Sequence, residues 1–159
     1  MSAAADLRGV LATLPDPEIP VLTIDDLGIL RDVRVDAHRH VEVDITPTYS
    51  GCPALDAIRD DVRRRVRDAG YDDVSVNVVL APAWTTDWMT GAARRKLHDH
   101  GIAPPRSRDA GSRLMSLPVA CPLCGSAHTG KVSHFGSTPC QALRRCSDCS
   151  EPFAHFKEH

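Results

Sequence analysis

The stretch "TPTYSGCPALD", residues 46–56, joins two segments that have different hydrophobic periods. Before it, Val41, Val43 and Ile45 alternate with polar residues, which is typical of a strand with one buried face. After it, apolar residues recur at the spacing of one helix face. They are Leu55, Ile58, Val62, Val66 and Ala69. The sequence therefore predicts a strand, a short connection that contains Cys52, and a helix that packs on the sheet.

The rest of the first hundred residues continues this succession of helices and strands. A helix is predicted over residues 3–13, where the prolines of "PDPEIP" end it. The predicted strands are residues 29–37, 40–46 and 74–80. The first two are expected to form a hairpin, and a last helix capped by Thr86 is expected to stop at Gly101. This order is typical of an α+β domain with a small, mainly antiparallel sheet covered on one face by helices.

Residues 102–118 separate two parts of the chain. This segment is rich in Pro, Ser, Arg and Gly and has no hydrophobic period, which is typical of a linker. We therefore predict one domain at residues 1–101 and a second, small domain at residues 119–159.

The composition indicates a globular protein that lacks the charge of a nucleic-acid binder. Of the 159 residues, 42% are hydrophobic and 25% are charged, and the net charge is −2. Residues 119–159 carry four basic and three acidic side chains, so no nucleic-acid partner is expected. The start "MSAAADLRGVL" lacks the features of a signal peptide, and no stretch approaches the ~20 apolar residues of a membrane span. We expect a cytoplasmic protein with no membrane association.

The most specific motif is a pair of Cys-x-x-Cys sequences, "CPLC" and "CSDC". Their cysteines are Cys121, Cys124, Cys146 and Cys149. Two such pairs complete the tetrahedron of a structural zinc site and leave no open position for catalysis. We predict a zinc ribbon, which is too small to fold without its metal. A rubredoxin-type iron site and two disulfides are the alternatives, and a reducing compartment favours metal over disulfides.

Further cysteines and histidines lie outside this motif. The sequence assigns no role to Cys140. Four histidines are potential substitute ligands, but with four cysteines present we expect each to be an exposed polar residue. They are His128, His134, His155 and His159.

Cys52 falls at or next to the N-cap of the predicted second helix, with Pro53 in the first turn. The free amides and the dipole of the helix would then point at the sulfur and lower the pKa of the thiol. A thiolate there could bind a metal or attack an electrophile. The alternative is a small cap residue that has no chemical role.

Four motifs in this order resemble the SufT-like domain of iron–sulfur assembly factors: "DPEIP", "LGIL", "TPTYSGCPALD" and "PAWTTDWM". Together with "CPLCGS", "FGSTPC" and "CSDCSEPFAHFK", the arrangement resembles the D-subunit family of phenylacetyl-CoA epoxidase over nearly the whole chain. The resemblance implies an iron–sulfur assembly domain followed by a zinc ribbon. It also implies an accessory protein of aerobic phenylacetate degradation that matures the iron or iron–sulfur centre of the oxygenase.

The resemblance also implies roles for individual residues. Cys52 matches the reactive cysteine of the assembly factors, so it is expected to be a transient ligand of iron or of an iron–sulfur cluster. Asp16, Pro17 and Glu18 match their acidic turn. The implied partners are the oxygenase or reductase subunits of the epoxidase. The formation of a homodimer is left as a further possibility. The chain departs from the family pattern at Gln141, where the family has lysine after the ribbon cysteine, and at Glu158, where a further cysteine often lies. These departures argue against an extra thiol cluster.

Two further interpretations stay open at this point. Trp84 and Trp88 lie four residues apart, so they could pack on the sheet or form a docking face for a partner. The chain could also be a stoichiometric structural subunit of the oxygenase complex, without metal transfer. An acyl-transfer enzyme with Cys52 as nucleophile is disfavoured, because the sequence shows no histidine paired with it as a base.

Overall fold

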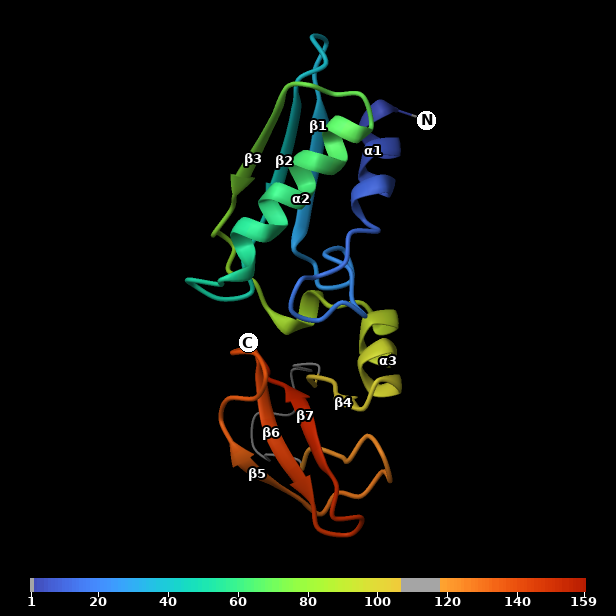
Figure 1. The fold of residues 1–159 in the computed structure, drawn as a ribbon, viewed down its shortest axis with the longest axis vertical. Helices are drawn as coiled ribbons and strands as arrows, with labels where there is room; N and C mark the ends of the chain where they lie inside the picture. Colours follow the sequence, from blue (N-terminus) through green and yellow to red (C-terminus); the bar gives the residue numbers. More distant parts are fainter. Residues whose placement is uncertain (1, 107–117) are drawn as a thin grey trace. The chain divides into compact units, whose positions relative to one another are not determined.

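The computed structural model describes residues 2–106 and 118–159, which form two compact units, Met1–Trp88 and Met89–His159. Each unit contains a sheet with helical segments beside it (Figure 1). The predicted boundary at 102–118 falls inside the second unit. Its first residues, Ile102–Ala103, form strand β4, whereas residues 107–117 lie outside the described residues.

The sheet of the first unit has the strand order β1-β2-β3. Strand β1 (Leu30–Val35) and strand β2 (Val41–Ile45) form the predicted antiparallel hairpin, which places Val33 opposite Val43. Strand β3 (Val74–Val78) pairs with β2 in parallel, because the intervening helix carries the chain back across the sheet. The class is therefore α+β, as predicted, and antiparallel pairs are in the majority over the two sheets, although one of the two strand pairs in this sheet is parallel.

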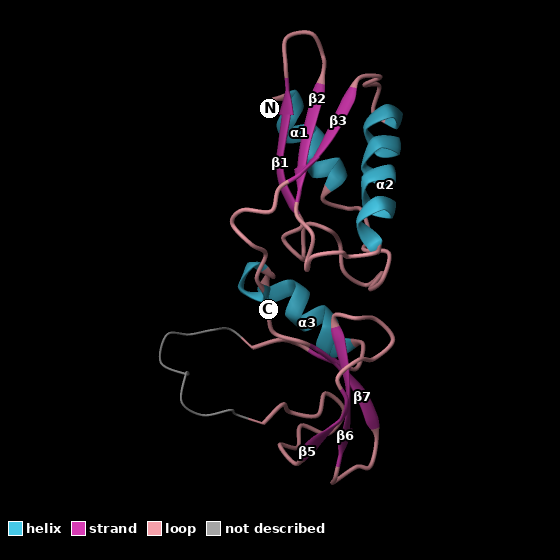
Figure 2. Cartoon of the chain, turned by 90° about the vertical axis from the view of Figure 1, so that its left-hand side faces the viewer, coloured by secondary structure: helices cyan, strands magenta, loops and turns pink. Residues whose placement is uncertain are grey.

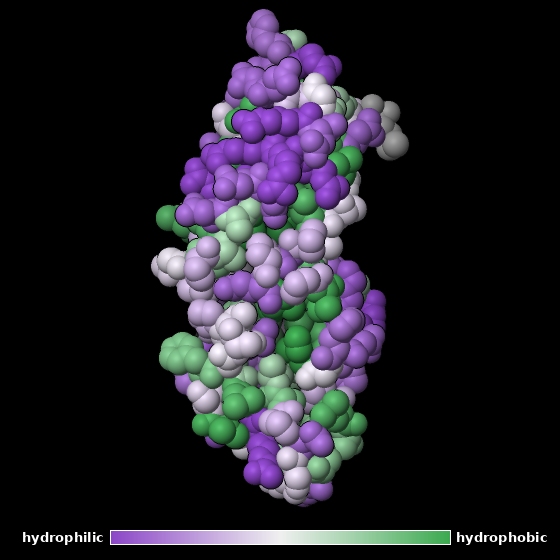
Figure 3. Space-filling view, viewed as in Figure 1, coloured by the Kyte–Doolittle hydropathy of each residue, from purple (hydrophilic) through white to green (hydrophobic). Residues whose placement is uncertain are grey.

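Helices α1 (Ala3–Leu11) and α2 (Ala54–Asp68) pack on one face of this sheet (Figure 2). The alternating residues of β2 point at them, and Val41, Val43 and Ile45 are fully buried. The apolar stripe of α2 meets them through Ile58, Val62 and Val66, all buried. The opposite side of α2 carries arginine and aspartate, and Figure 3 shows the hydrophilic surface that results. Hydrophobic burial along this one face positions the start of α2 and the loop before it.

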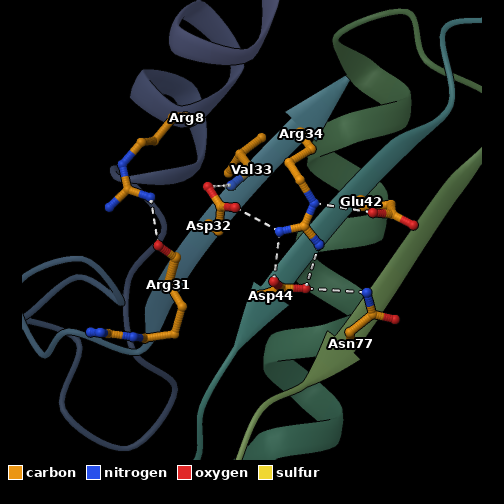
Figure 4. A network of polar contacts seen from close by, with 8 residues as sticks. All are labelled: Arg8, Arg31, Asp32, Val33, Arg34, Glu42, Asp44 and Asn77. Carbon is orange, nitrogen blue, oxygen red and sulfur yellow. Dashed lines mark hydrogen bonds and ion pairs between the residues drawn. The ribbon is translucent and has the colours of Figure 1, made fainter. Parts of the chain in front are cut away.

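The other face of the sheet carries an ion-pair network centred on Arg34 (Figure 4). Its guanidinium donates hydrogen bonds to Asp32 at 2.6 Å, to Asp44 at 2.8 Å and to Glu42 at 3.1 Å. Asn77 of β3 donates to Asp44 at 3.1 Å. The hydrogen bonds from Arg34 lower the pKa of Asp44. Exposed ion pairs add little to stability, but this network keeps the face polar.

Trp84 and Trp88 do not share one helical stripe. Trp84 is buried, and its indole N–H donates to the carbonyl of Leu27 at 2.7 Å. Trp88 ends a short 3-10 helix, η1 (Thr86–Trp88), and the guanidinium of Arg31 lies 3.9 Å from its ring centroid. Trp84 is therefore a core residue, and Trp88 packs on its own unit through Arg31.

The last helix begins later than predicted. Helix α3 spans Gly91–Asp99, and its N-cap is Thr90, whose hydroxyl accepts a hydrogen bond from the Ala93 amide at 3.0 Å. Thr86, the predicted cap, is fully buried at the start of η1 instead. The predicted stop is confirmed, since Gly101 follows the helix with a φ of +73°.

The second unit holds a four-stranded sheet with the order β4-β7-β6-β5. Strands β5 (Thr129–Ser133), β6 (Gln141–Cys146) and β7 (Pro152–Phe156) pair antiparallel, and β4 adds to β7 in parallel. Helix α3 packs on β4. None of the helices in the described part of the chain has the length and apolar character needed to cross a bilayer.

Candidate metal centre and the Cys52 site

The two Cys-x-x-Cys pairs converge at one end of the ribbon sheet. The four sulfur atoms all lie within 4.8 Å of one another. They belong to Cys121, Cys124, Cys146 and Cys149. Cys121 Sγ lies 3.8 Å from Cys149 Sγ, and Cys124 Sγ lies 3.6 Å from Cys146 Sγ. The sequence pairs are thus interleaved in space, and each contributes ligands to a single group.

The spacing of these sulfurs fits a tetrahedral metal. Zinc–sulfur bonds of ~2.3 Å place the corners of a tetrahedron ~3.8 Å apart, whereas disulfide sulfurs lie only ~2.05 Å apart. All of these cysteines are free thiols, so the disulfide alternative does not describe this arrangement. The donor set therefore fits a metal that prefers four thiolates.

Two tight turns position the four sulfurs. In the first turn, Cys121 accepts a hydrogen bond from the Gly125 amide at 2.8 Å, and Gly125 has a φ of +77°. In the second, the amide of Cys146 donates to Glu151 at 3.0 Å, and Ser150 has a φ of +65°. The sulfur of Cys146 accepts hydrogen bonds from backbone amides of the second turn, and the one from Cys149 has the largest effect. These bonds lower the pKa of the Cys146 thiol to about 7.

The small core of the ribbon is built on these cysteines. Buried Cys121 and Cys146 pack with Val119 and Phe153, and Cys149 lies against the same cluster. Few other apolar groups take part in this cluster. The ligand side chains therefore supply much of the interior, so the order of the ribbon depends on what holds the thiols together.

The histidines of the ribbon are not among the converging ligands. His128 is exposed, and its Nδ1 lies 3.2 Å from Asp148 Oδ2. The expectation that each histidine is exposed is wrong for His155, which is only 5% exposed. His155 lies on β7, where it pairs with buried Ala142 of β6. Cys140 is also buried and lies outside the four-cysteine group.

Cys52 sits in the connection between β2 and α2. The N-cap of α2 is Pro53, so Cys52 lies next to the cap, as predicted, and Pro53 stands one position earlier than predicted. Gly51 allows the turn with a φ of +80°. The Ala54 amide donates a hydrogen bond to the Cys52 sulfur. The first turn of α2 therefore faces the thiol, which is half-buried.

The acidic turn lies beside this cysteine. Asp16 is buried, and its Oδ1 accepts hydrogen bonds from the amides of Glu18 at 3.0 Å and Ile19 at 2.8 Å. Burial raises the pKa of Asp16 against the effect of these amides. Burial, followed by the charge of Asp16, raises the pKa of Glu18. The fold thus brings together the three candidate residues Asp16, Glu18 and Cys52.

The expected lowering of the Cys52 pKa is wrong. Burial is the largest effect and raises the pKa of this thiol, and the charges of Glu18 and Asp16 raise it further. The Ala54 amide and the side chain of Thr48 act in the opposite direction without overcoming them. The helix N-terminus alone is therefore a poor guide, because desolvation and nearby carboxylates both disfavour a thiolate.

Thr48 is a contact of this site that the sequence analysis missed. Its side chain hydrogen-bonds to Cys52. A threonine hydroxyl four residues before a cysteine in a loop has no periodic sequence signal that would predict this contact.

Among the described residues, the four-cysteine group is the only place where three or more potential ligand side chains converge. An ion on Cys52 would therefore have fewer than three ligand side chains from the described residues.

The fold and these sites define a class: an iron–sulfur assembly domain followed by a ribbon with four cysteine ligands. The iron–sulfur cluster assembly protein family matches residues 4–78, and the PaaD zinc beta ribbon domain matches residues 106–157. The D subunit of the putative 1,2-phenylacetyl-CoA epoxidase of Escherichia coli is 47% identical over 96% of this chain and 91% of its own length. The chain belongs to this family of epoxidase D subunits.

The first unit has relatives of its own. An Fe-S protein maturation auxiliary factor of Porphyromonas gingivalis is 39% identical over 58% of this chain and 88% of its own length. A crystal structure of a domain of unknown function, DUF59, from Bacillus anthracis matches with a TM-score of 0.55 and 29% identity, over 59% of this chain and 90% of that one. A conserved hypothetical protein from Thermotoga maritima matches with a TM-score of 0.51 and 27% identity, over 60% of this chain and 94% of that protein.

Proposed function

We propose that this protein is a cytoplasmic accessory factor of a phenylacetyl-CoA epoxidase system, and that it matures the iron or iron–sulfur centre of the oxygenase. The observation that carries this proposal is the grouping of Cys52 with Asp16 and Glu18 in a domain of the iron–sulfur assembly type. The name of the E. coli relative supports the pathway, and the names of the shorter relatives support the chemistry. The clients are the oxygenase or reductase subunits of the epoxidase.

In this proposal Cys52 holds its cargo only transiently. Its raised pKa keeps the free thiol protonated near neutral pH, so an arriving ferrous ion or cluster displaces the proton and binds the thiolate. The carboxylates of Asp16 and Glu18 attract the cation while they disfavour an unliganded thiolate. Because the site offers few ligands of its own, a client with more thiolates or carboxylates can take the cargo from it.

The ribbon has a separate, structural role. Its four thiolates saturate a tetrahedral ion, so we assign zinc to Cys121, Cys124, Cys146 and Cys149 and no reaction step to that ion. Zinc bound there, when present, replaces the missing core of the ribbon. The ribbon would then serve to dock on the client.

Co-expression of the epoxidase subunits with and without this protein tests the proposal. The matched variant is Cys52→Ser, which is nearly equal in size and touches none of the ribbon ligands. We expect this variant to fold and to keep its zinc, while the oxygenase made beside it is deficient in iron and activity. Fully active oxygenase from cells that co-express the Cys52→Ser variant would contradict the assigned mechanism.

The second candidate is a stoichiometric structural subunit without metal transfer. The observation in its favour is the name of the E. coli relative, which describes a subunit. Under this alternative the protein purifies with the oxygenase at a fixed ratio, and Cys52→Ser is silent. A complex that dissociates once the client is loaded favours maturation instead.

A further inference from the structure

A cavity of about 600 Å³ in the second unit is lined by four cationic side chains and one acidic one. Arg106, Lys131, Arg144 and Lys157 all line it, together with three histidines. Of the four basic side chains in residues 119–159, only Arg145 is absent from this lining. A chain of negative net charge therefore concentrates its few ribbon cations around one space.

Strand register places these cations on the same face of the ribbon sheet. Lys131 of β5 lies directly opposite Arg144 of β6. His155 of β7 lies opposite Ala142, which is on the same side of β6 as Arg144. Arg106 adds electrostatic repulsion on Arg144. Like charges placed directly across a strand pair destabilise a sheet, and an anion between them would relieve this repulsion.

Two buried donors in the lining point to an absent ligand. Within the described residues, Nε of Arg144 and Nε2 of His155 are buried without a hydrogen-bond partner. The contact between His155 Nε2 and Glu158 Oε1 is 3.5 Å long, which is beyond ordinary hydrogen-bond length. Buried polar groups are nearly always satisfied in folded proteins. Acceptor atoms inside the cavity would satisfy both donors.

The single acidic residue of the lining does not neutralise it. Glu158 Oε1 accepts a hydrogen bond from the Arg106 amide at 3.2 Å. Although burial acts to raise the pKa of Glu158, its ion-pair contact with His155 and the hydrogen bond from the Arg106 amide lower this pKa to about 2. The lining therefore holds one carboxylate and four Lys or Arg side chains. This excess of positive charge favours a ligand that carries several negative charges.

An exposed aromatic ring lies next to the cavity. Phe135 is 62% exposed and contacts His134 edge to face, with 5.0 Å between the ring centroids. Lys157 Nζ lies 4.6 Å from the centroid of the same phenyl ring. His134 and Lys157 both line the cavity. A flat base could therefore stack on Phe135 while its phosphates reach the cations.

We propose that this cavity binds a nucleotide that carries at least two phosphates. Its volume is that of a small-molecule site and exceeds the needs of a single inorganic ion. Arginine and lysine are the side chains that recognise phosphate oxygens, and here they converge from two strands and the segments beside the sheet. A free nucleoside diphosphate and the diphosphate part of coenzyme A share this chemistry.

Titration calorimetry of the full-length, metal-loaded protein tests the proposal with ADP, coenzyme A, adenosine and a short single-stranded oligonucleotide. ADP or coenzyme A should bind at one site per chain, more weakly at high salt, whereas adenosine should give no signal. Stronger binding of ADP identifies a free nucleotide as the ligand, and stronger binding of coenzyme A identifies its esters. Tighter binding of the oligonucleotide than of either would overturn the proposal in favour of nucleic acid.

Lys131→Gln is the informative variant, because Lys131 is exposed and lies outside the ribbon core. Loss of one charge-assisted contact should weaken ADP binding about tenfold or more, with metal content unchanged. Arg95→Gln is the matched control, since it removes one exposed charge from α3 and is not part of the lining. Equal affinities of the two variants, or no binding of either nucleotide to the unaltered protein, would overturn the site.

Discussion

Glu18, in the turn after α1, lies close enough to Cys52 for its charge to raise the pKa of that thiol. The two residues are distant in the sequence, and the fold brings the charge of Glu18 within electrostatic reach of the thiol. The relationship couples an acidic turn to the only cysteine of the first unit. It makes the reactivity of the thiol dependent on a carboxylate that can be altered separately.

Glu18→Gln should make Cys52 more reactive at a given pH. Removal of the negative charge lowers the pKa of the thiol, so the rate of alkylation should reach its midpoint at lower pH than in the unaltered protein. The measurement is the pH profile of iodoacetamide labelling at Cys52, read by peptide mass spectrometry. Asp72→Asn, an exposed charge removal in the same unit, should leave the profile in place. A midpoint below ~8.5, that of free cysteine, in the unaltered protein would contradict the raised pKa.

Asp16 allows the charge and the hydrogen-bonding role of a side chain to be separated. Asp16→Ala removes the acceptor of two amides and should destabilise the first unit by about 1–3 kcal/mol in urea unfolding. Asp16→Asn keeps an oxygen at this position and removes the buried charge. It should be as stable as the unaltered protein, or more stable, at neutral pH.

The pH dependence of Asp16 has a definite sign. Its pKa is raised in the folded state, so its contribution to stability is present below the unfolded pKa of ~3.9 and is lost as pH rises through the folded pKa. The advantage of Asp16→Asn over the unaltered protein should therefore grow from pH 3 to pH 7. An advantage that shrinks over this range would show that burial does not dominate at Asp16.

Loss of the metal should unfold the ribbon and spare the first unit. We expect one zinc per chain by elemental analysis, and Cys124→Ser should lower that content, because it removes one of four ligands. Chelation should then expose residues 118–159 to protease while Met1–Trp88 stays resistant, since this unit has its own core. Cys52→Ser is the control and should retain its zinc. A rate of ribbon proteolysis that is the same with and without chelator would contradict a structural metal.

Gly28 should tolerate no side chain. Its φ is +71°, and a Cβ atom there would lie 2.9 Å from Cβ of Trp88. Gly28→Ala should lower the free energy of unfolding by about 1–3 kcal/mol, because the backbone is strained and η1 must shift. Gly9→Ala in α1 meets nothing within 4 Å and should be neutral or stabilising by about 0.5–1 kcal/mol. Equal effects of the two substitutions in thermal unfolding would contradict the close packing at Gly28.

The sequence by itself determined the features that depend on local spacing. The period of two around Val43 and the helical period through Val62 predicted β2 and α2, because burial on one face requires those periods. The Cys-x-x-Cys spacing predicted one shared site for Cys121 and Cys149, since two such turns can bring four thiols to a common metal. The same local reading placed Cys52 next to a helix start.

Only the tertiary structure decided the properties that depend on distance through space. The direction of the Cys52 pKa shift follows from burial and from carboxylates of another loop, neither of which has a sequence signal. The parallel pairing of β3 with β2 and the position of Lys131 opposite Arg144 depend on how strands are ordered and registered. Electrostatic energies vary with separation and desolvation, and chain folding sets both. Residues that looked unremarkable along the sequence therefore became a cationic cavity once three strands aligned them.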